Sequence, residues 1–183
     1  LTLGVQDLVV VSEHHKHQRF ELDGVSLPVV HSYREGLEIA DAVVIANPSS
    51  LHGAYLARAV AVGKHVYLEK PVALKSVELD ESIEEVAVRG LVVATGFQFR
   101  FCHRLIELKR RVDARSLGQV LAVIAVCGEH IADYHPDEDY RVSYAARAEL
   151  GGGVLLTQIH QLDCLSWIFG AFASVTASGG VVS

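Results

Sequence analysis

Short, continuous apolar runs alternate along the first two thirds of this 183-residue chain with segments whose apolar residues recur at helical spacing. Runs of this kind are typical of strands buried on both faces of a parallel sheet. The segments between them have the pattern of amphipathic helices, and right-handed crossovers would place such helices on both faces of the sheet. The sequence therefore predicts an α/β fold with a doubly wound parallel sheet. The expected strands are residues 8–11, 29–30, 42–46, 65–68 and 91–95, and the expected helices are 50–62, 76–89 and 105–112.

The pattern changes near residue 117. A longer apolar run, 120–126, predicts a strand, and an irregular polar and aromatic segment follows it. Three successive glycines then lead into a helix expected over 154–168, which Gly170 ends, and 173–177 has the pattern of a further strand. We therefore expect two domains, residues 1–117 and residues 118–183.

Composition narrows the classes of function. Half of the residues are apolar and 21% are charged, a balance that provides a core and excludes a disordered chain. The net charge of −6, without a basic run, argues against a nucleic-acid partner. The chain has no run of about 18 apolar residues, so no membrane span is expected, and its start lacks the pattern of a signal peptide. Three widely spaced cysteines, Cys102, Cys127 and Cys164, fit reduced thiols in a cytoplasmic protein.

No metal site is expected. Three histidines lie close together in the sequence, His14, His15 and His17. Their spacing on a loop is not a known metal-ligand pattern with a carboxylate partner.

Polar residues follow three of the expected strands, at the edge of an open α/β sheet where ligands bind. These ends are Ala46-Asn47-Pro48, Glu69-Lys70-Pro71 and residues 96–100. A lysine between glutamate and proline is held at a turn, although on these residues alone it can equally be a solvated lysine of a loop. The glycine pattern GxGxxG of dinucleotide-binding turns is absent, and Gly151-Gly152-Gly153 does not match it.

Taken together, these segments resemble the Gfo/Idh/MocA oxidoreductase family. Residues 43–74 contain the family's Pro-x-x-x-His helix start, here Pro48 and His52, and its Glu-Lys-Pro turn. Residues 96–101, GFQFRF, resemble the family's glycine-aromatic-Asn/Gln-aromatic-Arg segment, and 150–170 resemble its triple glycine followed by His-x-x-Asp and a Trp-containing helix. The stretches YHPDEDYR and SYAARAELGGG resemble a sugar-active branch of the family.

The resemblance implies a fold in two parts. A Rossmann-type domain would be followed by an α/β domain with an open, mostly antiparallel sheet, which agrees with the change of pattern near residue 117. It also implies that this chain is truncated at both ends. The first strand and its glycine-rich turn would precede Leu1, which would explain the absence of GxGxxG, and most of the second sheet would follow Ser183.

The resemblance also implies catalytic and substrate-binding roles. Lys70 would hydrogen-bond the reacting oxygen near the nicotinamide, and His160 would take the hydroxyl proton as a general base. Asp163 would bind a substrate hydroxyl or orient His160, or it could equally cap a structural hydrogen-bond network. Arg100 would bind substrate or brace the domains. Tyr140 belongs to a polar, aromatic cluster suited to binding a sugar, or to a structured loop between the domains.

One position departs from the family pattern. Many relatives carry aspartate four residues before the histidine, where this chain has Leu156. Leucine can neither accept a proton nor polarise an imidazole, so an aspartate-assisted mechanism is not expected here.

The implied cofactor is NAD or NADP. An acidic residue after the second strand of a Rossmann fold favours NAD, which points to Glu13, whereas Ser12 with the basic residues that follow favours NADP. The residues expected near the cofactor are Ser12, Glu13, Ala46, Asn47, Pro48, His52, Glu69, Lys70 and Gln98.

The function expected from the resemblance is hydride transfer between a nicotinamide cofactor and a hydroxyl or carbonyl group of a sugar, cyclitol or nucleotide sugar. The partner would be that small molecule. Members of the family often form oligomers through the sheet of the second domain, so the resemblance also allows a homo-oligomer. The alternative is a catalytically silent fragment or binding module of the same family.

Overall fold

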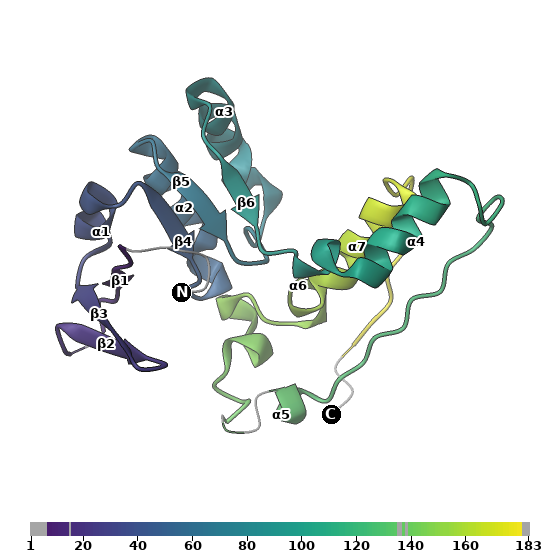
Figure 1. Ribbon diagram of the computed structural model, residues 1–183. Helices are drawn as coiled ribbons and strands as arrows, with labels where there is room; N and C mark the ends of the chain where they lie inside the picture. Colours follow the sequence, from purple (N-terminus) through teal and green to yellow (C-terminus); the bar gives the residue numbers. More distant parts are fainter. Residues whose placement is uncertain (1–6, 15, 135–136, 138, 181–183) are drawn as a thin grey trace.

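A parallel three-stranded sheet forms the centre of the computed structural model, which describes residues 7–14, 16–134, 137 and 139–180. Its strands are β4 (Ala42–Ile45), β5 (His65–Leu68) and β6 (Val93–Thr95), in that spatial order (Figure 1). The register places Val43 beside Val66 and Val66 beside Val93. The expected parallel sheet is confirmed, and all three strands lie within the predicted ranges.

The two faces of this sheet differ. Ile45, Val66 and Leu68 are buried, whereas Val44 and Tyr67, which are neighbours on the opposite face, are exposed by 66% and 43%. Helix α2 (His52–Ala61) covers the buried face, and α3 (Asp80–Arg89) packs against α2. Within the described residues no helix is found against Val44 and Tyr67, because α3 packs on its neighbouring helix α2.

A second small sheet lies beside the first, in the order β1-β3-β2. Strands β1 (Val10–Val11) and β3 (Val25–Val30) are parallel, and β2 (Arg19–Leu22) forms an antiparallel hairpin with β3. Helix α1 (Tyr33–Ile39) follows. The sequence analysis missed α1 and β2, although Asp23-Gly24 is a hairpin signal: both residues have positive φ, 47° and 79°, as a tight hairpin turn requires.

The helices near the parallel sheet begin with single 3-10 turns. Turn η1 (Ser49–Leu51) precedes α2, and η2 (Ser76–Leu79) precedes α3, so the α-helix expected from Ser76 starts at Asp80. Gly90 ends α3 in the left-handed conformation, as predicted. After β6, η3 (Gln98–Phe101) leads into α4 (His103–Asp113).

The C-terminal part is mostly helical. It contains α5 (Ile131–Tyr134), η4 (Tyr144–Ala146), η5 (Ala148–Leu150), α6 (Val154–Thr157) and α7 (Ile159–Phe169). Helices α4 and α7 lie side by side (Figure 1). The predicted helix over 154–168 is therefore interrupted at Gln158, and the boundary at 117/118 stays a prediction. Of the helices in the described residues, none combines the length and the hydropathy needed to cross a membrane.

The strands expected at 120–126 and 173–177 are wrong for this structure. Both segments carry no strand assignment, and Leu121, Ile124 and Val126 are exposed by 88–91%. An apolar run becomes a strand only when a neighbouring strand accepts and donates its backbone hydrogen bonds. Within the described residues neither segment has such a neighbour.

The two faces of the parallel sheet predict opposite responses to truncation. Leu68 is completely buried, so Leu68→Ala should lower the free energy of unfolding by about 2–5 kcal/mol through lost burial and a cavity. Val44→Ala, on the exposed face, should change it by less than about 1 kcal/mol. Urea denaturation followed by circular dichroism measures both, and equal losses would contradict this assignment of the core.

Candidate active site

The carboxyl ends of β4 and β5 frame a pocket of about 310 Å³. It lies where open α/β sheets bind ligands. Six of the residues expected near the cofactor meet here, although they come from two separate turns of the chain. The lining residues are Ala46, Asn47, Pro48, Ser49, His52, Glu69, Lys70 and Tyr144.

A second pocket, of about 270 Å³, adjoins the first and shares Ala46 and Asn47 with it. It extends to Val11 in β1, so Ser12 and Glu13 follow directly at its far end. The two pockets together run along the carboxyl ends of β1, β4 and β5. The Oδ1 atom of Asn47, which lines both, is buried and has no hydrogen-bond partner.

His52 ties the two turns of the pocket together. Its side chain is 1% exposed, with Nδ1 lying 2.6 Å from the Pro71 carbonyl oxygen and Nε2 lying 2.8 Å from the Asn47 carbonyl oxygen. Carbonyl oxygens only accept, so the protonated ring nitrogen donates in either tautomer. His52 thus holds the turns that carry Asn47 and Lys70, and its predicted contact with a cofactor stays a prediction.

Lys70 reaches from the sheet to the C-terminal helices. Its Nζ donates to the carbonyl oxygen of Thr157 over 3.1 Å. This carbonyl is available because the chain breaks between α6 and α7, where the Gln161 amide donates to Gln158 instead. The Glu69 carboxylate lies beside the same turn and accepts from the Lys70 amide at 3.3 Å.

His160 lies in the first turn of α7 and is 8% exposed. Burial lowers its pKa below the ordinary value, and the nearby positive charge of Lys70 lowers it further, against smaller opposing effects of Glu69 and Asp163. The imidazole is therefore neutral at pH 7, the form in which it can accept a proton. Its Nδ1 is buried without a hydrogen-bond partner.

The glycine triplet has a packing role. A Cβ atom on Gly152 would lie 2.4 Å from the carbonyl oxygen of Tyr144 and 2.6 Å from that of Ala145. A Cβ atom on Gly151, whose φ is 91°, would lie 2.8 Å from Ser49 Cβ. These close approaches allow the segment with Tyr144 to dock on the Lys70 pocket.

The remaining predicted residues lie elsewhere. Gln98 is exposed at the start of η3. Arg100 forms a two-pronged ion pair with Asp163, with bonds of 2.9 Å to Oδ2 and 2.6 Å to Oδ1. Tyr140 is not among the residues lining the Lys70 pocket, and its ring instead carries the Arg141 guanidinium at 5.1 Å. The cofactor contact predicted for Gln98 and the substrate-binding roles predicted for Arg100, Asp163 and Tyr140 stay predictions.

Sequence reasoning missed Tyr144, which lines the Lys70 pocket. Tyr144 and Tyr140 are four residues apart in one irregular segment, and no periodicity distinguishes which of them faces the sheet. Of the same segment, His135 lies outside the described residues. His15 also lies outside them, and the rest of the described chain shows no group of three or more His, Cys, Asp or Glu arranged to hold a metal ion.

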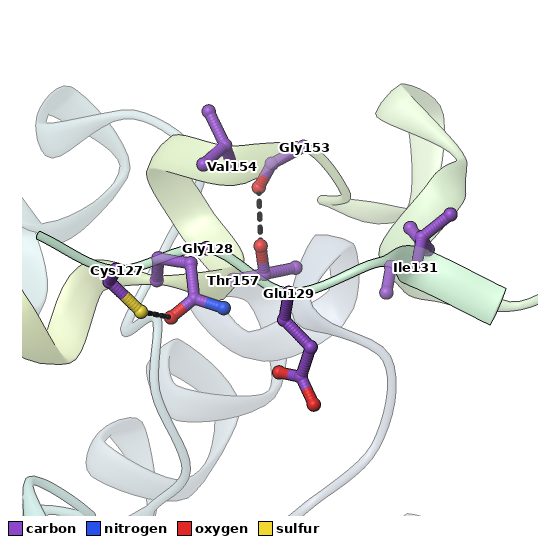
Figure 2. A pocket seen from close by; sticks show the side chains of 9 residues that line it. Cys127, Gly128, Glu129, Ile131, Gly153, Val154 and Thr157 are labelled. Atoms are coloured by element: carbon purple, nitrogen blue, oxygen red, sulfur yellow. Dashed lines mark hydrogen bonds between the residues drawn. The ribbon is translucent and has the colours of Figure 1, made fainter. Parts of the chain in front are cut away.

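A further pocket, of about 200 Å³, is lined by Thr157, the residue whose carbonyl oxygen accepts from Lys70 (Figure 2). The Thr157 hydroxyl donates to the Gly153 carbonyl oxygen at 2.8 Å (Figure 2). The Cys127 thiol donates to the Gln158 amide oxygen at 3.4 Å. Glu129 adds a carboxylate to the lining. The sequence carries no signal for this pocket, because its wall is formed by an extended segment without a motif.

Comparison with known families matches both parts of the chain. Residues 5–97 match an oxidoreductase family described as having an NAD-binding Rossmann fold, and residues 105–183 match the GFO/IDH/MocA C-terminal domain. The chain therefore belongs to the Gfo/Idh/MocA family of oxidoreductases, as its motifs indicated. The prediction of a nicotinamide dinucleotide as the cofactor class is confirmed by the family.

Curated relatives are considerably longer than this chain. The 2,7-anhydro-N-acetylneuraminate hydratase of Mediterraneibacter gnavus is 30% identical over 80% of this chain and 38% of its own length. The scyllo-inositol 2-dehydrogenase (NAD(+)) of Bacillus subtilis is 30% identical over 78% of this chain and 40% of its own length. The chain thus spans about 40% of the length of these relatives.

Solved structures show the same fold. The WlbA dehydrogenase from Bordetella pertussis, in complex with NADH and UDP-GlcNAcA, matches with a TM-score of 0.64 at 22% identity, over 79% of this chain and 42% of its own. A scyllo-inositol dehydrogenase from Lactobacillus casei matches with a TM-score of 0.59 at 24% identity, over 78% and 40%.

The close packing of the glycine triplet can be tested directly. Gly152→Ala should lower the free energy of unfolding by about 1–3 kcal/mol, because two backbone carbonyl groups must move to admit the methyl group. Gly179→Ala, where a Cβ atom meets nothing within 4 Å, is the matched control and should change stability by less than about 0.5 kcal/mol. Thermal or urea denaturation measures both variants, and a Gly152→Ala chain as stable as the control would refute the packing role.

Proposed function

We propose that this chain carries the cofactor site and the proton-transferring residues of an NAD(P)-dependent oxidoreductase that acts on a hydroxyl or carbonyl group of a sugar, cyclitol or nucleotide sugar. The observation that carries the proposal is the pair of adjoining pockets along the carboxyl ends of β1, β4 and β5, which ends at Lys70. An elongated dinucleotide needs such an elongated site.

The residues of the two pockets fit a nicotinamide dinucleotide. The buried Oδ1 of Asn47 lacks a partner within the protein, and a hydrogen-bond donor on the ligand would satisfy it. Ser12 and Glu13 would face the adenosine ribose, with Glu13 favouring NAD and Ser12 favouring NADP. Ala46, Pro48 and Glu69 line the way to Lys70. Gln98 would lie on the nicotinamide side.

Two residues would handle the substrate proton. The ammonium of Lys70 would hydrogen-bond the reacting oxygen and stabilise its deprotonated form. His160 would accept the hydroxyl proton, and we assign this to Nε2 because Nδ1 is sealed from solvent. When bound, the nicotinamide supplies the hydride acceptor or donor. The bond from Lys70 to the Thr157 carbonyl holds the lysine next to the helix that carries His160.

The substrate class rests on the relatives and on two polar side chains in the mostly apolar pocket near Thr157. The relatives include inositol dehydrogenases, a levoglucosan dehydrogenase and the hydratase, and the substrates in these names are sugar-like or cyclitols. Glu129 and Gln158 would provide acceptors and donors for substrate hydroxyl groups. Four further expectations stay predictions: sugar binding by Tyr140, a homo-oligomer, a cytoplasmic location and the absence of a nucleic-acid partner.

Cofactor binding is the first test. Fluorescence titration of the chain with NADH and with NADPH should show saturable binding of one of them. Asn47→Ala should weaken it about 3- to 10-fold through the loss of one hydrogen bond to the ligand. Lys75→Met, at an exposed lysine outside the pocket, is the control for Lys70→Met, and only Lys70→Met should weaken binding. A folded chain that binds neither nucleotide would contradict the proposal and favour a silent fragment.

The protonation of His160 predicts a pH dependence of stability. The pKa of His160 is lower in the folded chain than in the unfolded chain. As the pH falls below about 6.5, the unfolded chain therefore binds a proton at His160 before the folded chain does. Stability should therefore be unaffected by this group above pH 6.5 and should decline below it. Urea denaturation between pH 7.5 and 5 should show a steeper loss for the wild type than for His160→Gln. Parallel pH profiles for the two proteins would contradict a depressed pKa.

A further inference from the structure

The orientation of His160 has no polar support of its own. Nδ1 is buried without a hydrogen-bond partner, and Leu156, four residues earlier, offers no polar side-chain atom. An imidazole that serves as a base is usually oriented by an acceptor at its second nitrogen. In this chain something else must hold the ring in place.

Two aromatic rings from the segment after β6 enclose the imidazole. The Phe99 ring centroid lies 4.9 Å from that of His160 with the planes inclined at 37°, and the Phe97 ring meets it edge-on at 6.1 Å and 83°. Ring pairs at these separations attract beyond the burial of their surface. Together they restrict the imidazole from two directions while leaving it without a charged partner.

The same segment is locked to α7 by a strong ion pair. Arg100 adjoins Phe99, and its guanidinium donates two hydrogen bonds to Asp163, whose side chain is only 9% exposed. Asp163 lies one helical turn beyond His160. The guanidinium also lies over Phe97 at 5.7 Å and over Trp167 at 6.0 Å. Paired, planar bonds of this kind fix direction as well as distance.

We propose that Phe99, held against α7 by the Arg100–Asp163 ion pair, is the positioning residue that orients the His160 imidazole. Arg100 and Asp163 then affect the orientation of the His160 imidazole through the position of Phe99, because their charged groups bond to each other. The proposal deepens the proposed function, on which it rests for the role of His160 as a base.

A ring enclosed by aromatic side chains and lacking a carboxylate partner resists protonation. The charged groups that influence His160 are Lys70 and Glu69 from the end of β5 and Asp163 from its own helix, with Arg100 paired to Asp163. Burial is the largest effect, so removal of the covering ring should matter most.

The test follows the imidazole itself. The chain with isotopically labelled histidine would be titrated by NMR, with the His160 signal among the ten histidines assigned from its absence in His160→Gln. In Phe99→Leu water would reach the ring, and the midpoint of titration should rise by about half a pH unit or more toward 6.5. Phe99→Tyr, which keeps the ring, should titrate like the wild type.

Two further variants separate positioning from general damage. Phe101→Leu alters a phenylalanine of the same segment that is 80% exposed and should leave the His160 titration unchanged. Arg100→Lys keeps the positive charge but loses the paired bonds, and should shift the midpoint in the same direction as Phe99→Leu.

A wild-type midpoint retained in folded Phe99→Leu would overturn the proposal, as would equal shifts in Phe99→Leu and Phe101→Leu. The NMR readout needs neither cofactor nor turnover. A chain that fails to bind NADH or NADPH would defeat the proposed function and leave this result intact, so the two failures are distinguishable.

Discussion

The hydrogen bond from Lys70 Nζ to the Thr157 carbonyl oxygen connects the two halves of the site. It joins residues 87 positions apart, one at the end of a parallel strand and the other at a break between two helices. A continuous helix would have kept that carbonyl for its own ladder. The interruption at Gln158 therefore both orients α7 and provides the acceptor that anchors the lysine.

Other contacts keep this connection in place. The His52 ring lies between the Asn47 and Pro71 carbonyl oxygens of the turns after β4 and β5 and donates to one of them, and Asn47 and Lys70 line one pocket. Gly152 lets the segment with Tyr144 approach the same pocket closely. His52 and Gly152 belong to the family motifs, yet in this structure both contact the protein backbone. Their contacts help to place Lys70 in the pocket.

The accuracy of the sequence analysis followed the range of the interactions involved. Strands 42–45 and 65–68 were predicted well because they are short, apolar and bounded by polar turns, which are local features. The hairpin at Asp23-Gly24 had a local signal that the analysis overlooked. The run 120–126 was misjudged because a strand requires a partner, and its own apolar residues cannot reveal whether one is present.

The alternating pattern of the sequence was sufficient for the fold class, and its motifs, through the family resemblance, were sufficient for the family and for six residues that share the pocket at Lys70. Only the tertiary structure decided the roles of side chains that depend on distant neighbours. It paired Arg100 with Asp163, placed the Phe99 ring against His160 and brought Tyr144 to the pocket. These contacts join segments far apart in the chain, and no spacing within one segment encodes them.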